Sequence, residues 1–317
     1  DYAAVRMAAY TGDLKDWGSN LDIMSKKAKE LGSTTLFTAT QAADGMRLLG
    51  MAGLSAKEVI SAIPTVLNMA TAASMDLAQA SDMTIQVLKG MGLQISDMAR
   101  VTDVLSYVAN ASISEVASLG EAMKYVASVA SAAGVSIEET AAAMGVLSNA
   151  GRGATMAGTD IRRIILALEA PTKKATDALK QMGVQISHNA DGTVNFMKTM
   201  ESLGKANMTS AQAFAMFGKE GTSAALILAR SIPAWKEMTI GAQNSAGATA
   251  ELSKIMAGTA VGSFKMMKSA AESLLTSIGT PLLSVLQLLV AGFTGVMRAV
   301  TELAETTTTI CSGVASC

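Results

Sequence analysis

The feature that most constrains the fold is a short glycine turn that recurs between apolar, helix-periodic stretches. Gly53-Leu54-Ser55 and Gly134-Val135-Ser136 each place a glycine, an apolar residue and a serine in succession. Glycine favours the left-handed residue that ends one helix, and serine favours the N-cap of the next. The apolar residue between them can pack against the following helix, as Leu54 can against Val59. The pattern predicts helices joined by short turns.

Capping boxes mark the predicted helix starts. In a capping box, a Ser or Thr and a Glu or Gln three residues later accept hydrogen bonds from each other's backbone N–H groups. Such pairs are Thr38–Gln41, Ser55–Glu58, Ser112–Glu115 and Ser136–Glu139. They predict helices that begin directly after each Ser or Thr.

The glycine turn also recurs more loosely, as Gly92-Leu93 and Gly183-Val184. The intervals from Gly53 through Gly92 and Gly134 to Gly183 are 39, 42 and 49 residues. They predict a degenerate duplication of helical hairpins, too irregular for a regular solenoid. Between turns, apolar residues step by three or four, as helices require. One such face comprises Ile113, Val116, Leu119, Met123, Val126 and Val129.

Composition supports an all-α fold. Aromatic residues, which strands favour, make up 4% of the chain, whereas helix-favouring Ala and Met are abundant. The 22 methionines suit a deformable core. Asp191-Gly192 favours one short β-hairpin between residues 184–186 and 194–196. Pro64 predicts a kink or a break near Ile63.

We expect four parts along the chain. Residues 1–32 would form a helical lead-in, and residues 33–240 a core helical domain. The small, polar stretch 241–262 would be a flexible connection, and residues 263–317 a hydrophobic helical segment. The chain begins at Asp1 with no initiator Met and no secretory signal pattern, so we expect it to be a fragment of a longer protein.

The last part contains an uncharged apolar run from Ser273 to Met297. A run of about 20 apolar residues can cross the hydrocarbon core of a bilayer. Pro281 and Gln287 dilute this run, so a helix buried in a bundle fits equally well. The candidate membrane residues are Leu274, Leu275, Ile278, Leu282, Leu283, Leu286, Leu289, Val290, Phe293 and Met297.

Charge and residue inventory argue against nucleic-acid binding and catalysis. The net charge is −1, whereas proteins that neutralise DNA phosphates need a basic excess, so we expect no direct sequence-specific nucleic-acid binding. His188 is the single histidine, and Cys311 and Cys317 lie in the last seven residues. These residues can complete neither a nucleophilic triad nor the usual zinc site. We therefore expect no enzyme, metal or cofactor.

The glycine-rich connection at residues 151–160 superficially resembles a phosphate-binding loop. Its Gly153 and Gly158 have the required spacing, but Thr159-Asp160 stands where the loop needs Lys followed by Ser or Thr. A carboxylate at this point would repel phosphates. We reject nucleotide binding.

Several longer stretches, in order and at consistent spacing, resemble the core region of phage tail tape measure proteins. The resemblance covers roughly residues 20 to 260, and residues 263–317 match in hydrophobic character alone. The clearest stretches are Leu31-Gly-Ser-Thr-Thr-Leu-Phe-Thr-Ala-Thr-Gln-Ala-Ala43, Ala122-Met-Lys-Tyr-Val-Ala127, Ala150-Gly-Arg-Gly-Ala-Thr-Met-Ala-Gly-Thr159, Ile161-Arg-Arg-Ile164 and Phe217-Gly-Lys-Glu-Gly221.

The resemblance implies a virion protein of the tail tube lumen or tail tip that sets tail length and takes part in genome ejection through the host membrane. It implies tail tube protein, tail-tip or baseplate hub proteins and tail assembly chaperones as partners, and a homo-oligomer of three copies. Compact hairpins are not an extended rod, so we expect the measuring rod to lie mainly outside this segment. Two other classes remain as alternatives: a free membrane-active pore-forming toxin, and, far behind, a cell-wall hydrolase.

Overall fold

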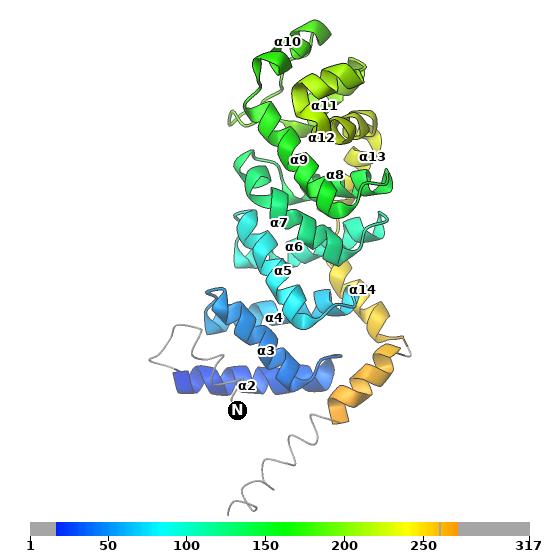
Figure 1. Ribbon diagram of the computed structural model, residues 1–317. Coiled ribbons are helices and arrows are strands. Elements are labelled where there is room, and N and C mark those ends of the chain that lie inside the picture. The colour runs from blue at the N-terminus through cyan, green and yellow to red at the C-terminus, as the bar shows by residue number, and fades with distance from the viewer. Residues whose placement is uncertain (1–16, 260, 272–317) are drawn as a thin grey trace, which may run out of the picture.

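The computed structural model describes residues 17–259 and 261–271, and these residues are all-α, as predicted (Figure 1). Residues 261–271 are helical as well. The remaining helices are α2 (Trp17–Thr34), α3 (Ala39–Met51), α4 (Ala56–Ala72), α5 (Leu77–Gly90), the 3-10 helix η1 (Ile95–Asp97), α6 (Met98–Asn110), α7 (Val116–Ala132), α8 (Ile137–Asn149), α9 (Ala154–Glu169), α10 (Lys173–Met182), α11 (Phe196–Lys205), α12 (Ser210–Arg230), α13 (Ile232–Gln243) and α14 (Ala248–Ala257).

Helices α3 to α9 form a stack of two layers that rises as the chain proceeds. In one layer α3 packs on α5, α5 on α7 and α7 on α9, and in the other α4 packs on α6 and α6 on α8. Each of these helices also packs against its neighbour in sequence. Figure 1 shows the rise from the blue helices to the green ones. The predicted array of helical hairpins is therefore confirmed.

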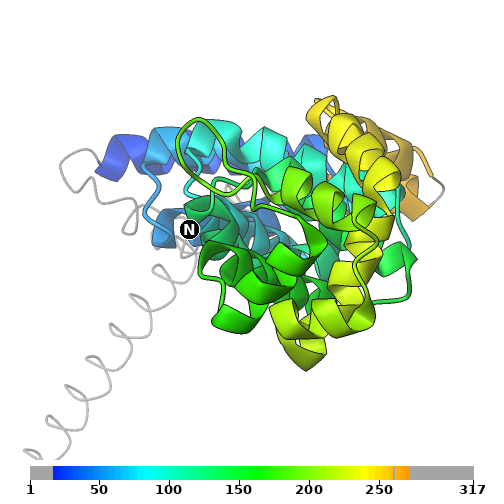
Figure 2. The same ribbon diagram turned by 90° about the horizontal axis from the view of Figure 1, so that it is seen from above.

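After α9 the chain crosses the far end of the stack and then runs back along it. The shorter helices α10 and α11 both pack on α12 at that end. Helix α13 packs on α8 and α6, and α14 packs on α6 and α4. Figure 2, a view turned by 90°, shows the yellow and orange returning helices on one side of the stack. The end of the described chain thus lies beside the connection between α2 and α3.

Left-handed residues make the turns of the stack. Gly53, Gly92, Gly134 and Gly183 all have positive φ, between 66° and 95°. The next N–H donates to a carbonyl five residues back, as Val135 does to Ala130 at 2.8 Å. Ser74 and Asn207 make the same turn without a glycine, with φ of 51° and 53°. The glycine pattern in the sequence therefore does not indicate these two turns.

One predicted helix start is wrong. Thr38 and Ser55 form complete capping boxes, but Ser112 accepts a hydrogen bond from Ser114, and α7 begins at Val116. Ile113, placed by its spacing on the buried face of α7, is 76% exposed. Its N–H donates to Asn149 Oδ1 of α8 at 2.9 Å, and this contact holds the loop outside the helix.

Pro64 does not break its helix, because α4 runs from Ala56 to Ala72 with Pro64 inside. Proline removes one backbone hydrogen bond from a helix interior and crowds the preceding turn. The flanking residues Ile63, Val66 and Leu67 are buried. Their packing offsets the loss, so the helix continues.

The glycine-rich connection is shorter than predicted. Gly151 has a φ of 84°, Gly153 is the N-cap of α9, and α9 begins at Ala154. Gly158 therefore lies inside a helix. It serves close helix packing, described below, and the residues after Gly153 do not form a connection.

The predicted β-hairpin is reduced to its turn. Gly192 has a φ of 87°, and one antiparallel bridge joins His188 to Val194. No strand forms in the described residues at 184–186 or 194–196. Asn195 instead caps α11, accepting from Lys198 N at 3.0 Å, and Phe196 is buried at the start of that helix. Asn195 and Phe196 therefore form the start of α11 and not part of a second strand.

Candidate functional site

Four of the five stretches with family resemblance lie on α7, α9 and α12 or in the turn before α9, and α9 packs against both α7 and α12. Gly158 of α9 faces the backbone of α7 so closely that a Cβ there would lie 2.4 Å from the carbonyl oxygen of Ala122. Real Cβ atoms do not approach oxygen so closely, so glycine alone fits this crossing. We call Ala122, Arg152, Gly158, Asp160, Arg163 and Glu220 the packing hub.

A charged network holds the hub together. Asp160 is 2% exposed and pairs with Arg152 of the preceding turn, and Arg163 Nη1 lies 3.8 Å from Asp160 Oδ1. Arg163 also pairs with Glu220 of α12. Burial raises the pKa of Asp160 above its ordinary value, although both arginines act to lower that pKa. The network joins the turn before α9, α9 itself and α12.

Helix α12 is kinked beside the hub. Gly218 has φ of 70° and ψ of 179°, a conformation open to glycine but strained for other residues. Thr222 Oγ1 donates to the carbonyl of Gly218 at 2.6 Å. The kink divides α12 within Phe217-Gly-Lys-Glu-Gly221, one of the stretches that carry the resemblance.

Two adjacent carboxylates of α8 bind neighbouring elements. Glu138 accepts a hydrogen bond from Arg100 Nε at 2.6 Å. Burial acts to raise the pKa of Glu138, but hydrogen bonds from Arg100 and the backbone hold this pKa below its ordinary value. Glu139 accepts from Met197 N of α11 at 3.1 Å, and burial raises the pKa of this carboxyl. Ser136 still caps α8 by accepting from Glu139 N at 3.1 Å. The glutamate side chain predicted for this box thus caps another helix.

The returning chain docks on the stack through polar groups. We call residues 247–259 and 261–271 the return segment. Asp103 of α6 accepts from Gly247 N at 2.8 Å and from Thr249 N at 2.9 Å, and so caps α14 from another helix. Ser253 Oγ lies 3.2 Å from Asn68 Oδ1 of α4. Ser269 Oγ reaches the carbonyls of Gly32 and Phe37, each at 2.7 Å.

Most of the large apolar residues of the return segment are exposed. The buried residues of α14 are Thr249 and Ser253, and helix 261–271 buries Gly262 and Ser269. Phe264 is 65% exposed and Met267 63% exposed. A helix normally buries its apolar side and exposes its polar side, so this arrangement is inverted. Other exposed apolar residues of the segment are Ile255, Val261 and Met266.

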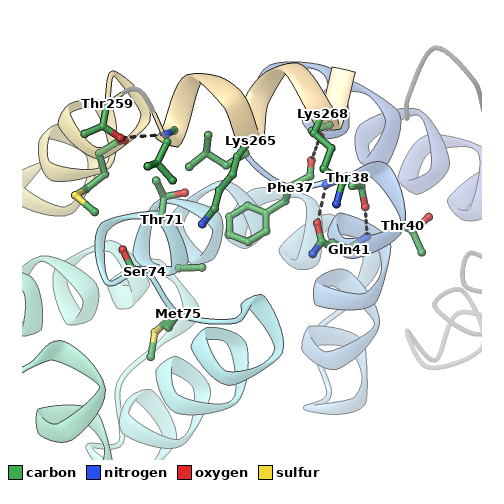
Figure 3. Close-up of a pocket in the computed structure, with 16 residues that line it drawn as sticks. Phe37, Thr38, Thr40, Gln41, Thr71, Ser74, Met75, Thr259, Lys265 and Lys268 are labelled. Carbon is green, nitrogen blue, oxygen red and sulfur yellow. Dashed lines mark hydrogen bonds between the residues drawn. The ribbon is translucent and has the colours of Figure 1, made fainter. Parts of the chain in front are cut away.

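A cavity of about 550 Å³ lies between the return segment and the start of the stack (Figure 3). Phe37 and Thr38 line it from the entry to α3, Thr71 lines it from α4, and Lys265 and Lys268 line it from the return segment. Figure 3 shows Lys265 extended into the space between Phe37 and Thr71. No aspartate or glutamate belongs to the lining of this cavity.

The glycine and capping residues predicted from sequence do not form one site. Gly53, Ser55 and Glu58 shape the entry to α4, whereas Gly134, Ser136 and Glu139 shape the entry to α8. Of the predicted set, Gly158 belongs to the hub. The sequence analysis did not identify Asp103 as a residue that binds another element. A carboxylate inside a buried stretch needs a partner, and Asp103 lies between the buried residues Val101, Thr102, Val104 and Leu105, so its position was a usable signal.

The candidate membrane run, Ser273–Met297, lies outside the described residues. Among the helices that are described, none combines the length and hydropathy needed to cross a membrane. The described residues also contain no cluster of three or more His, Cys, Asp or Glu side chains able to hold a metal ion.

Comparisons with known proteins agree on one kind of protein. The family model for phage-related minor tail proteins matches residues 25–220. The chain is 33% identical over 282 residues to a probable tape measure protein of Escherichia phage P2, covering 86% of this chain and 34% of that protein. It is 30% identical over 286 residues to a tape measure protein of Pneumococcus phage Dp-1, covering 87% of this chain and 25% of that protein. The chain thus spans about a third and a quarter of these relatives. No solved structure matches.

Proposed function

Because the chain belongs to the family of phage tail tape measure proteins, we propose that it is a compact helical domain of a ruler that sets tail length and takes part in genome ejection. The observation that carries the proposal is the family match over residues 25–220, which covers the whole stack from α2 into α12. Both relatives are named as tape measure proteins, which does not favour a free pore-forming toxin.

The stacked fold supports a domain that is not itself the measuring rod. One hairpin repeat, from Gly92 to Gly134, uses 42 residues. Stacked helices lie about 8–10 Å apart, so this repeat lengthens the stack by about 10 Å. The same residues in one extended helix would span about 60 Å, at 1.5 Å per residue. Per residue, the stacked domain therefore spans roughly a sixth of the length that an extended helix spans.

Duplication of one repeat tests this role in the phage. Duplicating residues 93–134 in the complete protein should lengthen tails by about 10 Å at most, because the added hairpin stacks. Inserting 42 residues of helix-forming sequence in the remainder of the protein should lengthen them by about 60 Å. Electron microscopy of tails measures both. If both insertions lengthen tails equally, the domain is measured in extended form and the compact-domain proposal is wrong.

We place the domain in the virion, at one end of the tail tube lumen or at the tail tip. Tail tube protein, tail-tip or baseplate hub proteins and tail assembly chaperones are the proposed partners. Cross-linking in intact virions tests the location. Cross-links should concentrate at one end of the tail, and cross-links spread evenly along the tube would contradict the proposal.

We further propose that copies associate, with three copies implied by the family. The outward face of the return segment, with Phe264 and Met267 exposed, supplies apolar surface of the kind that interfaces cover. The double substitution Phe264→Ser and Met267→Ser should shift the purified chain towards monomer in size-exclusion chromatography with light scattering. Ile240→Ser on α13, which is 57% exposed, is the matched control. A monomeric wild-type chain in detergent-free buffer would contradict association.

Contact with the host membrane during ejection is the last part of the proposal. Its support is the uncharged sequence from Ser273 to Met297. Purified chain should release dye from lipid vesicles, and a variant carrying Leu282→Asp and Leu286→Asp should not. Equal release by both would assign membrane activity to other residues.

A further inference from the structure

We propose that the cavity beneath the return segment binds a peptide segment of a partner protein that carries a carboxylate beside an apolar side chain. This assignment goes beyond the ruler function and does not depend on it. It rests on the size, charge and apolar lining of the cavity.

The cavity is much larger than an inorganic ion needs. Its volume is about 550 Å³. A water molecule in the liquid occupies about 30 Å³, and sites for organic ligands measure roughly 300–1,000 Å³. The space therefore accommodates side chains together with their backbone.

The charge of the lining selects for anions. Lys265 and Lys268 contribute two ammonium groups, and no carboxylate of the lining opposes them. Hydroxyl groups of Thr40, Thr71 and Ser74 add hydrogen-bond donors. Helix α3 begins at Ala39, so the positive end of its dipole lies at the same edge of the cavity. A carboxylate bound there would meet cations, hydroxyls and this dipole.

Apolar groups line the rest of the cavity. Phe37, Met75, Met256 and Val261 come from the stack entry, the turn after α4 and the return segment. Methionine adapts its shape to varied apolar partners. This mixture suits a peptide that presents one acidic and one apolar side chain together. A lipid surface fits less well, because the lining lies in a recess between two elements (Figure 3).

Fluorescence anisotropy with a defined probe tests the binding. The probe is a dye-labelled, acetylated peptide with the sequence Gly-Leu-Glu-Leu-Glu-Gly, titrated with the complete 317-residue chain. We expect saturable binding that weakens as salt rises, because salt screens the ion pairs. The variant K265E/K268E should lose at least about tenfold in affinity, since like charges then face each other. The variant K173E/K174E carries the same charge change on exposed residues of α10, at the far end of the stack, and should bind like the wild type.

Two altered probes separate this site from simpler ones. Replacing Glu by Lys in the probe should abolish binding, and replacing Leu by Ser should weaken it severalfold. If the Ser probe binds as well as the Leu probe, or inorganic phosphate competes as strongly as the unlabelled peptide, the cavity is a simple anion site and the proposal is wrong. Equal losses in both lysine variants would likewise overturn it. Tighter binding to anionic phosphatidylserine vesicles than to the peptide would assign the lysines to a lipid surface instead.

Photo-cross-linking locates the bound peptide directly and does not depend on a variant that weakens binding. Benzoylphenylalanine in place of Phe37 should cross-link to the probe, whereas benzoylphenylalanine in place of Phe214, an exposed residue of α12, should not. Circular dichroism establishes that each variant folds. Cross-linking at Phe214 and not at Phe37 would place the peptide elsewhere and end the proposal.

Discussion

The packing hub and the return segment use opposite means to join helices. In the hub, Gly158 brings α9 against the backbone of α7, and Asp160 of the charged network is buried. In the return segment, α14 packs on α4 and α6 through buried Thr249 and Ser253. Ser269 and backbone N–H groups donate hydrogen bonds to the stack, while the apolar Phe264 remains exposed. Close packing against a backbone leaves little room for change, whereas each buried polar contact depends on one donor keeping its acceptor. The stack is therefore joined by close backbone packing, whereas the return segment is joined to the stack by specific polar contacts.

The largest expected effect is at the hub. Gly158→Ala should destabilise the whole stack by about 2–3 kcal/mol, because the added methyl meets the carbonyl of Ala122 and forces a backbone shift. Urea unfolding followed by circular dichroism measures this loss. Gly18→Ala in α2, where a Cβ meets nothing within 4 Å, is the control and should not destabilise the chain. Equal effects of the two substitutions would mean that the crossing is looser than the structure indicates.

A smaller and local effect is expected at the return segment. Asp103→Ala leaves the N–H groups of Gly247 and Thr249 without their acceptor, at a cost of about 1–3 kcal/mol. Hydrogen exchange of residues 248–257 should accelerate while exchange in α7 and α9 stays slow. Asp177→Ala, an exposed aspartate of α10, is the control. Faster exchange throughout the stack would show that the two regions unfold together, and the comparison would fail.

The smallest expected effect is a pH dependence of the unfolding free energy at Asp160. Burial raises the pKa of Asp160 in the folded hub, so the folded state holds its proton more tightly than the unfolded state. The contribution of this group to stability is therefore complete below its ordinary pKa and is lost as pH rises through the folded value. Relative to Asp160→Asn, the wild type should lose unfolding free energy from acidic to neutral pH. Exchange of the return segment should not follow this change, and a parallel change would couple the two regions.

Local sequence patterns predicted the turns because their causes are local. Gly53 and Gly134 adopt left-handed conformations, and Ser55 caps α4, because each needs only the backbone within a few residues. The start predicted at Ser112 fails because Asn149, 37 positions along the chain, binds that loop. At this turn a hydrogen bond between elements overrode a local signal.

The candidate cavity was not predictable from sequence. Phe37, Thr71 and Lys265 lie far apart in the chain and carry no shared motif. Likewise, Asp103 and Thr249 gave no sign that one would cap the helix of the other. Their contacts exist because the chain reverses after α12 and returns along α8, α6 and α4.

The sequence by itself determined that this chain forms helices joined by glycine turns, and the order of its stretches indicated the tape measure family. Those features depend on backbone geometry and hydrophobic period, which operate over a few residues. The tertiary structure alone decided which helices stack, which carboxylates cap distant helices, and that Phe264 and Met267 of the return segment are exposed. Burial and long-range hydrogen bonding set these outcomes, because they depend on where the chain passes after it has turned.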